Sequence, residues 1–290
     1  MGCCCEYRAP RRLRFVPPAV VALLIAWLYG SFVRFAQPQL LARNVGVLEL
    51  LAFHVMAFLL CASLGQCLLS NDSFVVRRKK GDPLPPPPPL VAEVKANGAR
   101  RFCRRCQVWK ADRMHHCSSC KRCVLKMDHH CVYINKCIGY HNYKFFLQFL
   151  GWSSATCLYF SSLIFRHILM DHLDYATALF FHGRLHFWSP SLQISLAFFF
   201  GACLGAALLC FYLGHVALTA FNYTTLEYCE KRRDGDDYVN YFYLGILGNF
   251  QQVLGTYREL PYWFLPLATP SVVRRGGTSF PVNAKFAKAE

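Results

Sequence analysis

Four long apolar runs dominate the pattern of hydrophobic and polar positions along the chain. They lie at about residues 15–36, 45–69, 143–165 and 192–221. A helix needs about 20 predominantly apolar residues to cross the hydrocarbon core of a bilayer. Each run reaches that length, so the pattern predicts four transmembrane helices rather than the buried core helices of a large soluble domain.

Basic residues are concentrated in alternate segments between these runs. Four arginines lie in residues 8–14, and the segment between the second and third runs contains Arg77-Arg78-Lys79-Lys80 and many further cations. The other two links carry few. Because cytosolic segments of membrane proteins are rich in Lys and Arg, both termini and the central segment are predicted to be cytosolic. The expected organisation is a tail (1–14), two spans (15–69), a cytosolic domain (70–142), two spans (143–222) and a second tail (223–290).

The overall composition agrees with this layout. Hydrophobic residues make up 54% of the chain, yet its formal net charge is +16. Apolar blocks separated by basic blocks are typical of an integral membrane protein whose basic segments face anionic lipid headgroups. A nucleic-acid-binding protein would leave the apolar blocks without a role, so no nucleic-acid partner is expected.

Cysteine is concentrated in one segment. Seven of the 16 cysteines lie between residues 103 and 137, interleaved with paired histidines. The candidate ligands are Cys103, Cys106, His115, His116, Cys117, Cys120, Cys123, His129, His130, Cys131 and Cys137. Thiolate and imidazole ligands favour zinc, and structural zinc takes four of them. Two closed sites need eight ligands, so three of these groups would remain, and metal would supply most of the folding energy, roughly 10–16 kcal/mol per site.

The tetrad Asp128-His129-His130-Cys131 suggests chemistry in addition to metal binding. In an extended segment, alternation places His129 and Cys131 on one face and His130 on the other. His129 could then take the proton of Cys131 and produce the reactive thiolate. Asp128 could orient His129 if the chain bends before it. The alternative is that His129 and Cys131 are two more metal ligands.

Residues 103–145 resemble the cysteine-rich domain of the DHHC family of protein S-acyltransferases, or palmitoyltransferases. The matching positions are Cys103, Cys106, Lys110, Arg113, His116, Cys117, Cys120, Cys123, Asp128, His129, His130, Cys131, Asn135, Cys137, Gly139, Asn142 and Phe145. Thr224-Thr225-Leu226-Glu227 resembles the TTxE motif of the family, and residues 240–245 and 249–255 resemble its C-terminal motif. The resemblance covers most of the chain.

This resemblance implies an α-helical membrane protein with four transmembrane helices and a cytosolic, zinc-bound cysteine-rich domain between helices 2 and 3. It also implies how the ligands divide. The first zinc would be held by Cys103, Cys106, His116 and Cys123. The second would be held by Cys117, Cys120, His130 and Cys137. Cys131 would be the nucleophile, His129 its base and Asp128 the acid that orients this base.

The implied activity transfers a long-chain acyl group, palmitoyl above all, from acyl-CoA to cysteine thiols of membrane-associated substrate proteins. The acyl group would pass through a thioester on Cys131. Lys110 and Arg113 match family positions that contact the CoA phosphates, with solvated basic residues as the less favoured alternative. The expected location is an endomembrane (Golgi or ER) or the plasma membrane. The expected partners are acyl-CoA, the bilayer and substrate proteins. An accessory subunit is compatible with this prediction.

The chain departs from the family at several positions of this domain. Ala111 stands where proline is usual, Val132 and Tyr133 where Pro-Trp is usual, and Lys136 where asparagine is common. None of them is a predicted ligand or the nucleophile. Tyr133 would keep an amphipathic ring at the membrane interface, where such rings are favoured.

Three further features leave alternatives open. The proline tract at residues 81–90 is read as a semi-rigid spacer, with a docking site as the alternative. Small residues at 151–156 indicate either close helix packing or a roomy acyl cavity. Cys3, Cys4 and Cys5 are candidate S-acylation sites, with three free thiols as the alternative. The rival functions are a non-catalytic zinc-finger scaffold, which would tolerate loss of Cys131, and a membrane-anchored ubiquitin ligase, which leaves the Asp-His-His-Cys tetrad unexplained.

Overall fold

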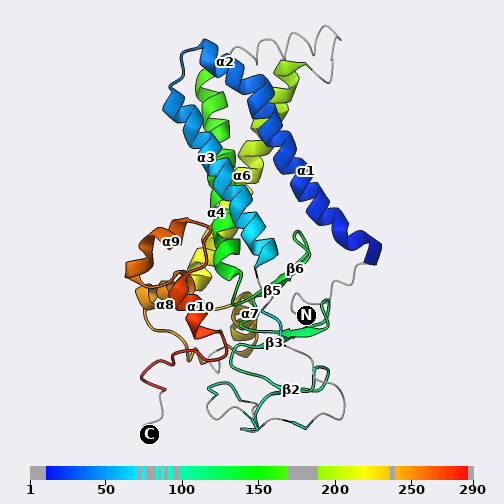
Figure 1. Cartoon of the computed structure of the whole chain (residues 1–290), viewed down its shortest axis with the longest axis vertical. Coiled ribbons are helices and arrows are strands. Elements are labelled where there is room, and N and C mark those ends of the chain that lie inside the picture. The colour runs from blue at the N-terminus through cyan, green and yellow to red at the C-terminus, as the bar shows by residue number, and fades with distance from the viewer. Residues whose placement is uncertain are drawn as a thin grey trace. The chain divides into compact units, whose positions relative to one another are not determined.

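The computed structural model in Figure 1 describes residues 11–70, 73–75, 83–84, 86–87, 91–94, 98–168, 189–235 and 239–286. The cysteines at 3–5, the basic run at 77–80 and most of the proline tract lie outside these residues. The chain divides into two compact units. One comprises Pro18–Leu64 and Gln148–Leu213, and the other comprises Met1–Pro17, Gly65–Leu147 and Gly214–Glu290.

The first unit is helical. It contains η2 (Phe32–Ala36), α2 (Gln37–Ala42) and most of four longer helices: α1 (Val16–Ser31), α3 (Val47–Leu69), α4 (Tyr143–His167) and α6 (Pro190–Ala220). The short helix η1 (Arg11–Phe15), which precedes α1, and the last residues of α3 belong to the second unit. Its core is aromatic and aliphatic, and includes Phe32, Phe53 and Phe160. Polar contacts add to this core: Trp27 Nε1 donates to Gln193 Oε1 at 3.1 Å, and the Tyr159 hydroxyl donates to the Glu49 carbonyl at 3.1 Å.

Among the described residues, three helical segments are long and apolar enough to cross a membrane: Leu13–Ala42, Val47–Leu69 and Pro190–Ala220. The first extends beyond the predicted run, which ended at residue 36. The predicted third run forms α4, a helix of 25 residues, which is not among the three. It carries Lys144, Gln148, Arg166 and several serines, and these lower its mean hydropathy.

The small residues of α4 pack closely at its glycine. A Cβ atom added at Gly151 would lie 3.1 Å from the ring of Tyr212 on α6. Ser153 and Ser154 in the next turn are buried. Close helix packing therefore accounts for Gly151, as small residues at helix interfaces usually do.

The second unit contains three antiparallel hairpins of two short strands each. They are β1 (Phe102–Cys103) with β2 (Val108–Trp109), β3 (His115–Cys117) with β4 (Arg122–Val124), and β5 (His129–Cys131) with β6 (Lys136–Ile138). Each turn ends on a residue with positive φ: Gln107 at 55°, Lys121 at 56° and Asn135 at 50°. The three hairpins therefore share one turn geometry.

Short helices complete this unit: α7 (Thr225–Asp234), α8 (Ile246–Leu254), η4 (Tyr257–Glu259), α9 (Leu260–Phe264) and α10 (Pro270–Arg275). Thr224 and Glu227 form a capping box that starts α7. Asn249 on α8 donates to the Ala220 carbonyl at 2.8 Å, at the end of α6. The Tyr140 hydroxyl donates to the Val272 carbonyl at 2.7 Å, so the C-terminal segment is tied to the hairpin domain.

Candidate functional site

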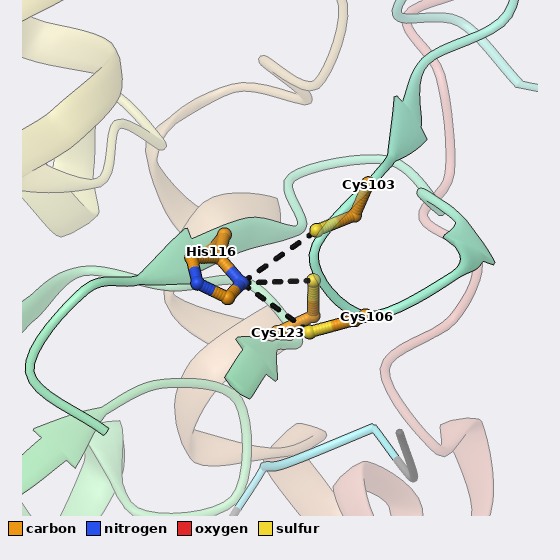
Figure 2. Close-up of side chains that lie close together, drawn as sticks. All are labelled: Cys103, Cys106, His116 and Cys123. Atoms are coloured by element: carbon orange, nitrogen blue, oxygen red, sulfur yellow. Dashed lines mark hydrogen bonds between the residues drawn. The ribbon is translucent and has the colours of Figure 1, made fainter. Parts of the chain in front are cut away.

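Cys103, Cys106, His116 and Cys123 form the first ligand cluster, with their ligand atoms all within 4.8 Å of one another. Figure 2 shows the imidazole of His116 facing the three sulfurs. The distances from His116 Nδ1 to the sulfurs of Cys103, Cys106 and Cys123 are 3.6, 3.3 and 3.8 Å. Ordinary Zn–N and Zn–S bond lengths at a tetrahedral centre give an N···S separation of about 3.6 Å. The donors present therefore fit a tetrahedral metal.

A second cluster has the same composition: Cys117, Cys120, His130 and Cys137. His130 Nδ1 lies 3.7, 3.4 and 3.5 Å from the sulfurs of Cys117, Cys120 and Cys137. The two clusters use the eight ligands that the family resemblance implied. His115 and His129 are in neither cluster, nor is Cys131.

The ligand positions repeat every 14 residues from one hairpin to the next, and this repeat explains how the ligands divide between the two clusters. Each cluster combines a Cys-x2-Cys turn from one hairpin with a paired His and Cys from the next, and the pairs His116–Cys123 and His130–Cys137 are directly opposite in their ladders. The turn cysteines at 103 and 106 recur at 117 and 120. In the third hairpin the same two positions are Cys131 and Ile134. Because Ile134 offers no ligand, the third turn lacks the pair of cysteines that the first two turns supply to a metal. Cys131 therefore lies outside both clusters. The sequence contains this repeat, but ligand counting alone does not reveal it.

Cys131 lies at the end of β5, with only 8% of its surface exposed. His129 lies two residues before it and interacts electrostatically with its thiol, and it also donates from Nδ1 to Asp128 Oδ2 at 2.6 Å. Burial lowers the pKa of His129, but its interactions with Asp128 and Cys131 outweigh this and raise the pKa to about 10. His129 is therefore poised to carry a proton next to the thiol.

Asp128 is fully buried and is held from both sides. The hydroxyl of Thr225 donates to Oδ2 at 2.8 Å and its backbone amide donates to Oδ1 at 2.9 Å. Burial acts to raise the pKa of Asp128, but the bonds from His129 and Thr225 stabilise the carboxylate and hold the pKa below its usual value. Lys126, two residues earlier, has a φ of 42°.

Three aromatic side chains near His129 were not picked out from the sequence. The His129 ring packs against Phe146 and His215, with centroids 5.1 and 6.0 Å away. The Tyr143 hydroxyl lies 3.2 Å from His215 Nδ1. A single histidine in an apolar run carries no spacing signal, so only the fold brings His215 to this site.

The two predicted CoA-binding residues differ in their surroundings. Arg113 is fully buried and donates to both carboxylate oxygens of Glu227 at 2.7 Å. It also donates to the side chain and the carbonyl of Asn222, at 2.8 and 2.9 Å. A guanidinium held in this way does not fit the expected contact with a CoA phosphate. Lys110 follows β2 and is partly exposed.

The described residues thus combine apolar helices, two clusters of soft metal ligands and a separate thiol with an acid–base pair. The family model described as DHHC palmitoyltransferase matches residues 96–232. Palmitoyltransferase ZDHHC15 of Rattus norvegicus is 31% identical, over 97% of this chain and 85% of that protein. Its Xenopus laevis counterpart is 33% identical over 92% and 81%. Palmitoyltransferase ZDHHC2 of Homo sapiens is 29% identical over 92% and 76%.

The chain belongs to the DHHC palmitoyltransferase family. This confirms the family and the activity class predicted from the sequence, that of a protein-cysteine S-palmitoyltransferase.

Proposed function

We propose that this chain transfers a long-chain acyl group, palmitoyl above all, from acyl-CoA to cysteine thiols of membrane-associated proteins through a thioester on Cys131. The observation that carries the proposal is the isolation of Cys131 from both ligand clusters. Its thiol interacts electrostatically with His129, and Asp128 holds His129 by a hydrogen bond. A thiol, a base and an orienting acid form the arrangement that activates a nucleophile.

The chain's own residues can move every proton that the reaction needs. The Cys131 thiolate attacks the thioester carbon while its proton rests on His129. The carbon–sulfur bond to CoA breaks, and His129 returns the proton to the departing CoA thiolate. In the second step, His129 takes the proton of a substrate cysteine, whose sulfur attacks the Cys131 thioester. Cys131 then leaves as the thiolate, and Asp128 stabilises the charged imidazole in both steps.

Zinc is the metal that we propose for the two ligand clusters, because three thiolates and one imidazole in a tetrahedral set favour it. The eight ligands are those of the two clusters described above. When bound, the ions would cross-link hairpins that have little apolar core of their own. Their proposed role is structural, since each tetrad is complete without substrate.

A bilayer is the proposed surrounding of the helical unit, with four spans that include α4 and with both termini and the hairpin domain in the cytosol. A fatty chain prefers hydrocarbon by about 0.8 kcal/mol per CH2. A thiol close to the cytosolic face can meet both the acyl chain and a cytosolic substrate. We place the enzyme in an endomembrane (Golgi or ER) or the plasma membrane.

The CoA phosphates are proposed to contact Lys110, and the net charge of +16 favours the approach of an anionic ligand. For Arg113 we propose a structural role instead of a contact with CoA. Its buried pair with Glu227 joins the hairpin domain to the start of α7, the helix whose first residue holds Asp128.

The direct test is to label wild type, Cys131→Ser and Cys131→Ala with an alkyne fatty-acid probe and map the labelled peptides. We expect hydroxylamine-sensitive label at residue 131 in wild type, its loss in Cys131→Ala and no transfer to a substrate protein. Label in Cys131→Ser should resist hydroxylamine, because an oxygen ester is more stable. Cys229→Ser is the matched control, because Cys229 lies on α7 outside both tetrads, and it should keep the label. Transfer at the wild-type rate by Cys131→Ala would favour the scaffold alternative.

A further inference from the structure

Lys136 lies directly opposite Cys131 in the β5–β6 hairpin. Side chains of directly opposed residues in antiparallel strands project to the same face. The hairpin therefore has a face that carries Cys131, Lys136 and His129, and a face that carries the metal ligands His130 and Cys137.

The ammonium group of Lys136 is bound to the end of α3. Its Nζ atom donates to the Leu68 carbonyl at 2.6 Å and to the Ser70 carbonyl at 2.8 Å. The last carbonyls of a helix lack partners within the helix, and a cation is favourable there. Because α3 ends at Leu69, Lys136 ties the hairpin of Cys131 to the last turn of a candidate membrane-spanning helix.

This last turn of α3 lies close to the reacting thiol. The Cys67 thiol is near enough to interact electrostatically with both Cys131 and Lys136. It also lies 4.0 Å from the Asn142 carbonyl, one residue before α4. A hairpin with three residue pairs is marginally stable alone, so a contact to this helix end can fix where Cys131 stands.

We propose that Lys136 is a positioning residue for acyl transfer, and this inference rests on the proposed function of Cys131. Its tether fixes Cys131 relative to the end of α3, where the carbonyl of a membrane-embedded acyl chain arrives. Asparagine, which is common at this position in the family, is neutral and too short to reach the same two carbonyls.

The test uses full-length protein in lipid nanodiscs and compares wild type, Lys136→Asn, Lys136→Gln and Lys136→Arg. The rate of single-turnover acylation at residue 131 is measured with acyl-CoA donors of 14, 16 and 18 carbons. A misplacement of about 1 Å can cost on the order of 100-fold in rate. We expect Lys136→Asn and Lys136→Gln to lose at least about 10-fold at saturating donor, with little change in KM. The rate difference between chain lengths should narrow, because the thiol is no longer fixed relative to the helix end.

Lys136→Arg keeps the cation and several donors, so it should restore most of the rate. Zinc content and thermal midpoint are measured for every variant, because Lys136 adjoins the ligand Cys137. Lys136→Gln keeps a polar side chain with part of the methylene stem, so at least one neutral variant is expected to fold. Lys121→Gln, in the turn of the β3–β4 hairpin, is the control and should keep the wild-type rate.

Wild-type acylation at residue 131 tests the proposed function independently of Lys136. If that acylation occurs, the inference is overturned when the zinc-loaded Asn and Gln variants react at the wild-type rate with an unchanged chain-length profile. It is also overturned when Lys136→Arg is as slow as they are. A neutral variant that loses zinc would show that Lys136 acts on the metal site instead, which likewise contradicts a positioning role.

Discussion

At the scale of single residues, Asp128 is a buried carboxylate that stabilises protonated His129 beside the Cys131 thiol. Its carboxylate has no solvent contact and depends on three hydrogen bonds, one from His129 and two from Thr225. Asp128→Asn keeps the shape of the side chain but removes the charge that stabilises protonated His129. We expect acylation of residue 131 to fall on the order of 100-fold or more, the range of general acid–base contributions.

The measurement for this variant is the single-turnover rate of thioester formation with palmitoyl-CoA, at equal zinc content. Thr225→Ser keeps both donors to Asp128 and is the matched control, which should stay close to wild type. An Asp128→Asn protein that reacts as fast as wild type would mean that His129 needs no carboxylate.

The buried pair of Arg113 and Glu227 leads to a prediction about stability. Burial raises the pKa of Glu227, but Arg113 outweighs this and holds the pKa below its usual value. Removing one member of a buried pair leaves an unpaired charge and costs about 3–5 kcal/mol. Arg113→Ala should therefore lower the thermal midpoint sharply, whereas Arg258→Ala, at an exposed position, should change stability by less than about 0.5 kcal/mol.

The pH dependence of this pair has a definite sign. Because the folded-state pKa of Glu227 is depressed, its contribution is present above the unfolded value, near 4.5, and is lost as the pH falls through the folded pKa. Thermal midpoints of wild type and Arg113→Ala should thus converge in acid. A difference that grows as the pH falls from 7 would contradict this assignment.

At the scale of elements, the sequence predicts local patterns well and contacts across the chain poorly. The alternation of His129, His130 and Cys131 follows from a strand period of two, and β5 has that alternation. The Thr225–Asp128 and Arg113–Glu227 bonds join residues 97 and 114 positions apart. No period or spacing encodes such pairs, so the burial of Arg113 could not be foreseen, and a phosphate contact was expected instead.

The hairpins also make a prediction about metal removal. Their buried residues are largely the ligand cysteines with a few side chains such as Met114, Val124 and Met127. A strong chelator should therefore unfold this domain, since structural zinc supplies roughly 10–16 kcal/mol. We expect hydrogen exchange of residues 102–138 to accelerate while the core of α3 stays protected. Retained protection of the three hairpins in metal-free protein would show that they fold without the ion.

At the scale of the whole molecule, the long helices differ in hydropathy, and α4 is more polar than the others. Three segments of the described chain qualify as membrane spans by length and composition. The polar residues of α4 weaken the same pattern that predicted a fourth span. A single crossing between them, by α6 alone, would place the hairpin domain and the C-terminal tail on opposite sides of the membrane. Yet Asp128 and Thr225, one from each of these segments, are hydrogen-bonded. That bond requires both segments on one side, which two crossings between them, by α4 and α6, satisfy.

Glycosylation mapping tests this topology. An Asn-x-Ser acceptor inserted in the link between α4 and α6 should be glycosylated if α4 crosses the bilayer, because that link would then face the lumen. Acceptors placed after residue 280 and within residues 83–94 should remain unmodified. If α4 does not cross, the link stays on the same side as the hairpin domain, which we propose to be cytosolic, and its acceptor is not modified. An unmodified link together with a modified C-terminal acceptor would indicate three spans, and the Asp128–Thr225 bond could not form.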